Sequence, residues 1–187
     1  MTDKSEIRQK MLLSRDSLNI ETREKAVRAF TKNALSLPEL RFARAAALYF
    51  PVKSEMDVLP LGKALRERGV KTLLPVVEQK DAPLVFKEFS DAFALEKGAF
   101  GIPVPPANAP VARPDVIIAP LSAFDRKGGR TGYGGGFYDR TLAAFETKPF
   151  YVGAAFGAQE CDEIPCEKTD FTLDCIVTEK EIIRIRS

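Results

Sequence analysis

VIIAPL at residues 116–121 and GGRTGYGGGFYDR at residues 128–140 decide the fold. The first is a short continuous apolar run, which is typical of a strand buried on both faces of a sheet. The second contains six glycines in thirteen residues and leads into a helical pattern over 137–146. A buried strand followed by a glycine-rich turn and a helix is typical of a parallel sheet covered by helices.

The rest of the chain repeats this alternation of apolar runs and helical patterns. A helix is expected over 57–68, ending at Gly69, between the first two of the remaining runs. Two more helices are expected at the amino-terminal end, over 4–18 and over 21–37, where Pro38 stops the second. The other predicted strands are AAALYF at 45–50, TLLPVV at 72–77, YVGAAF at 151–156 and CIVTEK at 175–180. We therefore expect an α/β fold, a three-layer α/β/α open sandwich with a mostly parallel sheet.

The domain organisation follows from length and texture. A chain of 187 residues suits one domain, and no internal repeat or composition shift divides it. The stretch 98–114 is rich in Pro, Ala and Gly and lacks periodicity, so we interpret it as a connection over the surface. We expect a single domain over residues 1–187.

Composition excludes several function classes. The 28 Lys and Arg residues against 26 Asp and Glu residues give a net charge of +2, which provides no broad attraction to duplex nucleic acid or an anionic membrane. The chain has no histidine, and this excludes Ser-His and Cys-His nucleophile pairs, histidine acid–base catalysis and histidine-containing zinc sites. Chemistry here must depend on carboxylates, cations, hydroxyls, glycine backbone or a bound metal.

The cysteines and the amino terminus suggest where the protein works. Cys161, Cys166 and Cys175 match no zinc or redox spacing, and their odd number argues against a disulfide framework. The opening MTDKSEIRQK precedes no apolar segment, and no apolar run approaches the length of a membrane span. We expect a cytoplasmic protein, a monomer, with no nucleic-acid partner and no membrane partner.

The glycine segment could bind a phosphate. Glycine allows positive φ and lets backbone N–H groups approach an anion, while the following helix adds the partial positive charge of its amino terminus. The segment is neither a P-loop nor the dinucleotide fingerprint. Two other interpretations remain open from the residues alone: a flexible surface loop, and a single-strand nucleic-acid segment in which aromatic rings stack on bases.

Several charged residues have two interpretations each. Asp139 could bind a magnesium ion that bridges phosphate oxygens, or could simply favour the helix dipole in the first turn. Arg130 could contact a phosphate, or could be solvated. Lys4 and Arg8 lie four residues apart and share a helical face with Arg15 nearby, which is also the pattern of a solvated face.

Glu55 follows the first predicted strand directly. The carboxyl ends of strands are where open α/β sheets bind ligands, so Glu55 could accept hydrogen bonds from a ligand amine. It could equally be an ordinary glutamate of a surface loop.

Taken together, these residues resemble the 5-formyltetrahydrofolate cyclo-ligase family over essentially the whole chain. The resemblance includes Lys4 and Arg8 as K-x-x-x-R, LYFPVKSE at 48–55, VIIAPLSAFD at 116–125, the glycine motif ending in FYDR, and IPCEKTDFTLDCIVTE at 164–179. It implies an ATP- and Mg²⁺-dependent cyclisation of 5-formyltetrahydrofolate to 5,10-methenyltetrahydrofolate, with release of ADP and phosphate. In the family's scheme the formyl oxygen is phosphorylated, N10 attacks the resulting iminium phosphate, and phosphate leaves. No protein nucleophile is expected.

The resemblance also implies roles for individual residues. Phe50 would pack on the pterin, and Glu55 would accept from its N–H groups. Asp139 and Asp170 would bind magnesium. The ATP contacts would be Lys4, Arg8, Arg130, Thr131, Gly132, Tyr133, Gly134, Gly135, Gly136, Phe137 and Tyr138, of which the stretch from Tyr133 to Phe137 would also contact the folate substrate.

Two positions depart from the family pattern. Many relatives carry basic residues where this chain has Tyr133 and Gly135, and many have His where this chain has Thr169, just before Asp170. Two other functions also remain as alternatives. One is a transferase or isomerase of similar architecture that binds a phosphate ligand without ATP turnover. The other is a single-strand RNA-binding module, which the charge of +2 disfavours.

Overall fold

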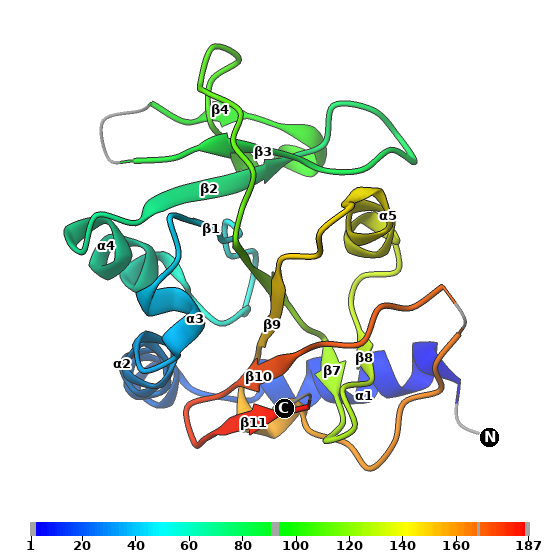
Figure 1. The fold of residues 1–187 in the computed structure, drawn as a ribbon. Coiled ribbons are helices and arrows are strands. Elements are labelled where there is room, and N and C mark those ends of the chain that lie inside the picture. The colour runs from blue at the N-terminus through cyan, green and yellow to red at the C-terminus, as the bar shows by residue number, and fades with distance from the viewer. Residues whose placement is uncertain (1–2, 91–93, 168, 186–187) are drawn as a thin grey trace.

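The computed structural model describes residues 3–90, 94–167 and 169–185, so parts of the expected 1–187 domain at both ends lie outside the described residues. Its centre is a seven-stranded sheet with helices on both faces, which confirms the predicted three-layer α/β fold. Figure 1 shows α2, α3 and α4 on one side of the sheet and α5 on the other. The strands, in spatial order, are β11 (Ile182–Arg184), β10 (Cys175–Val177), β9 (Phe150–Ala154), β6 (Val116–Pro120), β1 (Ala45–Ala47), β2 (Lys71–Val76) and β3 (Val85–Glu88).

The five strands expected from the sequence are the five that pair in parallel. β10, β9, β6, β1 and β2 form a continuous parallel sheet, with register pairs such as Ile118 with Val152 and Ala46 with Thr72. β3 and β11 were missed, and both are antiparallel strands at the two edges. Each edge strand pairs with the strand before it in the chain and has only three or four residues, too few for a clear period.

Alternate residues of the parallel strands fill two separate cores. Ile118 and Val152 pack with the helices on one face, and Ile117 and Tyr151 belong to the core on the other face. Since successive side chains of a strand point to opposite faces, burial of both sets explains why the strands are apolar without interruption.

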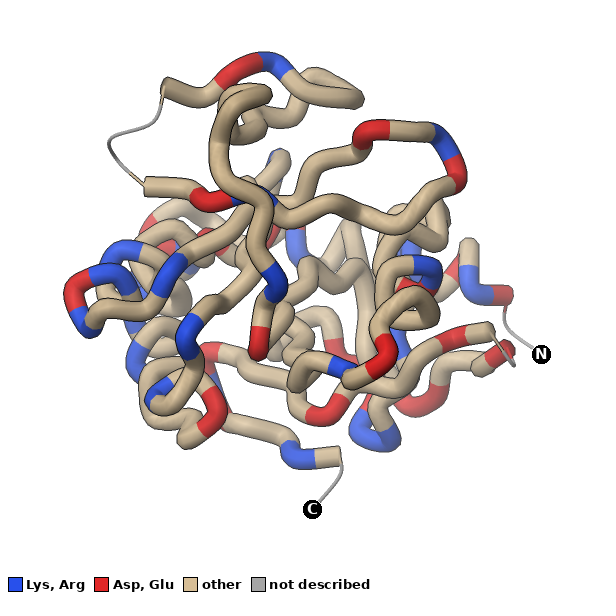
Figure 2. Tube along the Cα trace, turned by 45° about the horizontal axis from the view of Figure 1, so that its top comes forward, with Lys and Arg blue, Asp and Glu red and all other residues tan. Residues whose placement is uncertain are grey.

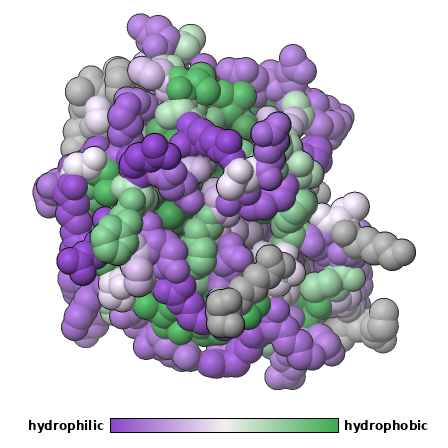
Figure 3. Space-filling view, viewed as in Figure 1, coloured by the Kyte–Doolittle hydropathy of each residue, from purple (hydrophilic) through white to green (hydrophobic). Residues whose placement is uncertain are grey.

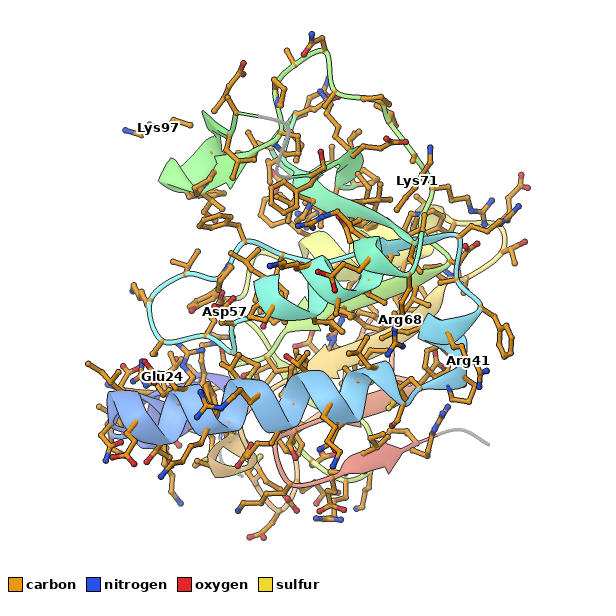
Figure 4. All side chains as sticks on the ribbon, turned by 90° about the vertical axis from the view of Figure 1, so that its left-hand side faces the viewer. Glu24, Arg41, Asp57, Arg68, Lys71 and Lys97 are labelled. Carbon is orange, nitrogen blue, oxygen red and sulfur yellow. The ribbon has the colours of Figure 1, made fainter. Side chains whose placement is uncertain are left out.

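The helices on the first face are α2 (Ile20–Leu35), α3 (Pro38–Arg41) and α4 (Leu59–Glu67). Asn19 caps α2 by accepting a hydrogen bond from the N–H of Thr22 at 2.8 Å, and α2 buries Phe30 completely. Figure 4 shows α2 crossing in front of the sheet below α4, and Arg68, just beyond α4, donates to the carbonyl oxygen of Leu35 at the end of α2. The predicted end of α4 at Gly69 is confirmed, with φ +82°.

The predicted boundaries differ in detail from the observed ones. α1 (Lys4–Asp16) ends two residues earlier than expected, and α2 ends at Leu35. Pro38 does stop α2, but it also begins the short helix α3, because proline suits the first turn of a helix. α5 (Phe137–Ala144) follows the glycine segment as predicted.

The stretch 98–114 is more ordered than a plain connection, so that interpretation was wrong in part. A 3₁₀ turn, η1 (Ala99–Gly101), is followed by β5 (Pro103–Val104), which pairs with β4 (Glu96–Lys97). This small hairpin, in which Figure 4 labels Lys97, lies away from the layer of α2 and α4. A second hairpin joins β7 (Ala123–Phe124) and β8 (Arg130–Thr131), and η2 (Gly157–Gln159) follows β9.

The order of the strands predicts where a ligand binds. The chain runs from β1 outward to β2 on one side, and then returns to build β6, β9 and β10 on the other side. The strand order therefore reverses between β1 and β6, and open α/β sheets bind ligands at the carboxyl ends of the strands at such a point. Here those ends lead into 48–56 and into Pro120 and Leu121.

The surface is polar and mixed in charge. Figure 2 shows acidic and basic residues interspersed along the chain, and Figure 3 shows apolar patches separated by polar residues on the face it presents. Within the described part of the chain, no helix is both long and apolar enough to cross a membrane.

Candidate active site

Two cavities adjoin at the carboxyl ends of β1 and β6. The first has a volume of about 590 Å³ and is lined by the glycine segment together with charged residues of α1 and of the loop before β10. The second has a volume of about 470 Å³ and is lined mostly by apolar residues of β2, the loop after β1 and η1. The two share Pro120, Tyr133, Gly135, Phe137 and Tyr138. A charged cavity and an apolar cavity therefore meet along one wall.

The glycine segment has the geometry of an anion cradle. Gly134 and Gly136 have φ values of +89° and +64°, a region that other residues rarely adopt. Gly136 is the N-cap of α5, and no side chain among the described residues caps this end of the helix. The amino terminus of α5 is therefore free of a side-chain partner beside the first cavity, where backbone N–H groups and the helix dipole favour a negative charge.

Two arginines at the first cavity carry buried donors that have no partner. The Nε atoms of Arg8 and Arg140 are buried and make no hydrogen bond within the described part of the chain. Arg140 uses its Nη2 to donate to the carbonyl oxygen of Gly135 at 2.7 Å and lies over the ring of Phe137. Arg8 lies beside Gly134. Unpaired buried donors are costly, so an anion that accepted from them would be bound favourably.

Arg130 is held at the first cavity by two partners. Its Nη2 donates to Oδ1 of Asp139 at 2.6 Å, and its Nε donates to the hydroxyl oxygen of Tyr151 at 2.9 Å. Burial lowers the pKa of Arg130, but Tyr151 and Asp139 raise that pKa more, so the guanidinium group stays charged. Burial also raises the pKa of Tyr151 to about 12, which keeps its hydroxyl protonated. Asp139 also accepts from the N–H of Phe171 at 2.9 Å.

Lys4 pairs with Asp170 across the first cavity, with Nζ 2.5 Å from Oδ2. Burial opposes both charges, yet the pKa of Asp170 is lowered by the N–H of Glu167 and by Lys4, while the pKa of Lys4 is raised by Asp170. Each side chain is 20% exposed, so solvent reaches the pair only partly. Lys4 and Arg130, which the resemblance assigns to ATP, are thus paired with Asp170 and Asp139, which it assigns to magnesium.

The second cavity contains Phe50 and the buried carboxylate of Glu55. Oε2 of Glu55 accepts from the N–H of Val52 at 2.8 Å. Burial raises the pKa of Glu55, while this hydrogen bond and the charge of Arg15 act in the opposite direction. A buried acceptor in an apolar cavity suits a flat ligand that carries N–H donors.

The structure brings all the predicted site residues to these two cavities. Phe50 and Glu55 line the second cavity. Tyr133, Gly135, Phe137 and Tyr138 line both. The first cavity alone receives Lys4, Arg8, Arg130, Thr131, Gly132, Gly134, Gly136, Asp139 and Asp170. Gly134 and Gly136, which the resemblance assigns to both ligands, are thus found only on the charged side.

Sequence reasoning missed several residues of the site. Phe100 lies 81% exposed in η1, lines the second cavity and stacks edge-on against Phe137. Its stretch was interpreted as a plain connection, and only the isolated aromatic residue among Gly and Pro signalled otherwise. Arg140 ends the glycine motif, and Tyr151 begins a predicted strand, so both could have been found by position. Arg15 was noted only as a neighbour of Lys4 and Arg8 on the helix.

The residues at the first cavity suit a magnesium–triphosphate complex. Asp139 and Asp170 supply hard carboxylate oxygens, and magnesium is usually bound by one or two carboxylates together with substrate phosphates. Over 3–90, 94–167 and 169–185, no three acidic or cysteine side chains cluster as a cation site. A metal here would accordingly depend on the phosphates for its remaining ligands.

Comparisons with known proteins agree with this geometry. The 5-formyltetrahydrofolate cyclo-ligase family matches residues 1–179. The 5-formyltetrahydrofolate cyclo-ligase of Haemophilus influenzae is 34% identical over 176 residues, which cover 91% of this chain and 94% of that protein. The enzyme of that name from Mycolicibacterium smegmatis is 32% identical over 192 residues, covering 98% and 97%.

Solved structures show the same architecture. The Aquifex aeolicus 5,10-methenyltetrahydrofolate synthetase superposes with a TM-score of 0.86 at 34% identity, covering 98% of this chain and 93% of that one. The synthetase from Mycoplasma pneumoniae superposes with a TM-score of 0.76 at 21% identity, covering 95% and 99%. At 21% identity, the similarity to the Mycoplasma pneumoniae structure supports only the fold.

Proposed function

The chain belongs to the 5-formyltetrahydrofolate cyclo-ligase family, and from this premise we propose that it converts 5-formyltetrahydrofolate to 5,10-methenyltetrahydrofolate at the expense of ATP, releasing ADP and phosphate. One observation carries the assignment of the two substrates: a charged cavity built on a glycine segment adjoins an apolar cavity with a buried carboxylate, and both share Tyr133, Phe137 and Tyr138. Two substrates that must react with each other would lie side by side in these two cavities.

We assign the triphosphate of ATP to the first cavity. Lys4, Arg8, Arg130 and Arg140 supply positive charge, and the segment 131–136 supplies backbone close to the ligand. The unpaired Nε atoms of Arg8 and Arg140 support this assignment, because phosphate oxygens would accept from them. Asp139 and Asp170 would hold Mg²⁺, which would neutralise charge on the transferred phosphoryl group.

We assign the pterin of the folate to the second cavity. Its apolar walls, including Phe50 and Phe100, would pack on the ring system, and Glu55 would accept from the pterin N–H donors. Burial excludes water that would compete for this carboxylate.

The reaction requires positioning more than it requires protein nucleophiles. The formyl oxygen at N5 attacks the γ-phosphorus, the bond from that phosphorus to ADP breaks, and N10 then attacks the activated carbon, from which phosphate leaves as the N10 proton is lost. The protein's task is to hold the formyl oxygen in line with the γ-phosphate at the common wall of the cavities. A chain without histidine can do this, since cations and backbone N–H groups stabilise the charges that develop.

The direct test mixes the protein with 5-formyltetrahydrofolate and Mg-ATP and follows the methenyl product by its absorbance. We expect product and ADP to appear in equal amounts, and no product when ATP or magnesium is omitted. A folded protein that forms neither product nor ADP would contradict the proposal.

The alternative is a transferase or isomerase that binds a phosphate ligand without turning ATP over. The polar lining of the first cavity would accept such a ligand, but the alternative gives no role to the adjoining apolar cavity. ADP release that depends on 5-formyltetrahydrofolate distinguishes the two, because the alternative predicts none.

A further inference from the structure

Arg15 is a buried cation whose ion pair, among the described residues, is with an exposed carboxylate. Its side chain is only 2% exposed, and the nearest carboxylate oxygen among the described residues belongs to Asp16, 3.8 Å from Nε. That carboxylate is itself 57% exposed and lies close to the hydroxyl of Ser54 as well. Nη1 of Arg15 is buried and has no hydrogen-bond partner among the residues that the structure describes. Buried charges are normally paired, so burying Arg15 in this way lowers the stability of the folded protein.

The contacts that Arg15 does make reach both cavities. Nε donates to Oγ of Ser54 at 2.9 Å, and Nη2 lies 3.4 Å from the hydroxyl oxygen of Tyr133. Ser54 is the residue before Glu55 in the loop after β1. Tyr133 stands in the wall that the two cavities share. One guanidinium group therefore joins α1, the loop that carries Glu55 and the glycine segment.

Arg15 also acts on Glu55 electrostatically. The positive charge of Arg15 lowers the pKa of Glu55, against the larger effect of burial, which raises it. The other titratable groups that face Glu55 are the hydroxyls of Tyr49, Tyr133 and Tyr138, whose own pKa values are raised first of all by burial. The N–H of Val52 and the hydroxyl of Tyr133 also lower the pKa of Glu55 by hydrogen bonds, and Arg15 adds the effect of a positive charge.

We propose that Arg15 is a positioning residue for the folate substrate: through Ser54 it holds the loop that carries Glu55, and it holds Tyr133 in the common wall of the two cavities. The proposal rests on the assignment of the second cavity to the folate. Arg15 lines neither cavity, so it acts through Glu55 and Tyr133 and does not touch the substrate.

The test compares Arg15→Met with a matched control, Arg23→Met. Arg23 is also an arginine at the junction of α1 and α2, but within the described part of the chain its hydrogen bonds go to the carbonyl oxygens of Leu18, Arg15 and Asp16. We expect Arg15→Met to weaken 5-formyltetrahydrofolate binding about tenfold or more by calorimetric titration without ATP, and to raise its KM likewise, with little change in the KM for ATP. Arg23→Met should lower Tm without changing either constant.

A pH series separates positioning from mere stability. Without Arg15, the pKa of Glu55 loses one of the influences that oppose burial, so less of the carboxylate is ionised at a given pH. The affinity of Arg15→Met for 5-formyltetrahydrofolate should therefore rise as pH increases from 6 to 8, while that of the wild type changes less. In a Glu55→Gln background, the added Arg15→Met change should no longer produce this pH dependence. A pH-independent loss in Arg15→Met, or a loss equal to that of Arg23→Met, would overturn the proposal.

Arg15→Lys keeps the proposal testable if Arg15→Met does not fold. Lysine retains the charge but lacks the fork that reaches both Ser54 and Tyr133. We expect a several-fold loss of folate affinity with the pH profile of the wild type, and wild-type affinity in a folded Arg15→Lys variant would overturn the positioning role. Failure of the proposed function would look different, since the wild-type protein would then neither bind nor convert 5-formyltetrahydrofolate.

Discussion

The guanidinium group of Arg8 lies directly beside Gly134, so that a Cβ atom added to Gly134 would be 3.5 Å from Nη2 and 3.6 Å from Nη1 of Arg8. The amino-terminal helix and the glycine segment, more than a hundred residues apart, thus form one wall of the first cavity. The side chain that Gly134 lacks would occupy the space between this cation and a ligand. Gly134 also has φ +89°, a backbone conformation that favours glycine here.

We expect Gly134→Val to abolish ATP binding while leaving the fold intact. A β-branched residue resists positive φ at a cost of about 1–3 kcal/mol, and its methyl groups would press on the guanidinium of Arg8. Gly134 is exposed on the cavity surface, so the core is not disturbed. Calorimetric titration with Mg-ATP measures the affinity, and circular dichroism measures the fold.

Gly132→Ala is the matched control for this change. A Cβ atom at Gly132 would meet nothing within 4 Å, and its backbone is not left-handed. This variant should bind ATP nearly as well as the wild type. Unchanged ATP affinity in folded Gly134→Val would remove the glycine segment from the triphosphate site.

Asp139→Asn should lower turnover far more than it lowers stability and should raise the magnesium concentration needed for half-maximal rate. The change removes an anionic magnesium ligand with little change in volume. It also frees Arg130 from its 2.6 Å partner, although the bond of Arg130 to Tyr151 remains. A magnesium titration of the initial rate, made beside Asp170→Asn, measures each effect. Equal magnesium dependence in wild type and Asp139→Asn, with a shift only in Asp170→Asn, would move the metal role to Asp170.

The sequence indicated the parallel core of the fold because its strands are buried on both faces and so read as unbroken apolar runs, such as VIIAPL. The edge strands β3 and β11 were missed because they have only four and three residues, too few for a clear alternation of apolar and polar positions. η1 and β5 escaped for a related reason. A turn with Phe100 at φ +57° is stabilised by its surroundings and not by its own propensities.

The residues of the site were predictable as a set, but their mutual contacts were not. The sequence of the glycine segment itself predicts an anion site. The spacing of Lys4 and Arg8 indicates only a solvated helix face, and their role depends on the packing of α1 beside that segment. The ion pair between Lys4 and Asp170 joins positions 166 residues apart. Arg15 is harder still, since only the packed structure shows that this cation is buried between Ser54 and Tyr133.

Changing both Lys4 and Arg8 to Ala should raise the apparent KM for ATP by tenfold or much more and should largely spare the KM for 5-formyltetrahydrofolate. Each charge-assisted hydrogen bond to phosphate contributes about 1.5–3 kcal/mol. Both residues line only the first cavity. Lys10→Ala, an exposed cation on the same helix, is the control. If both Michaelis constants of the double variant equal those of the wild type, α1 is a surface element and other cations neutralise the triphosphate.

The last prediction concerns stability and pH at a carboxylate outside both cavities. Oδ2 of Asp115 accepts from the N–H groups of Arg44 and Ala45 at 2.7 and 3.1 Å, which connects the start of β6 to the start of β1. Burial raises the pKa of Asp115, but these hydrogen bonds outweigh it and lower the pKa below its ordinary value. A lowered folded-state pKa adds stability that is complete above the unfolded-state pKa, about 3.9, and is lost as pH falls through the folded-state value.

Asp115→Asn should therefore lower Tm by a few degrees at pH 7, and the difference from wild type should shrink below about pH 4, because a protonated Asp resembles Asn. Thermal melts from pH 3 to pH 7 measure this, with exposed Asp162→Asn as the control. A Tm difference that stays constant over that range would show that the charge of Asp115 does not stabilise the junction of β1 and β6.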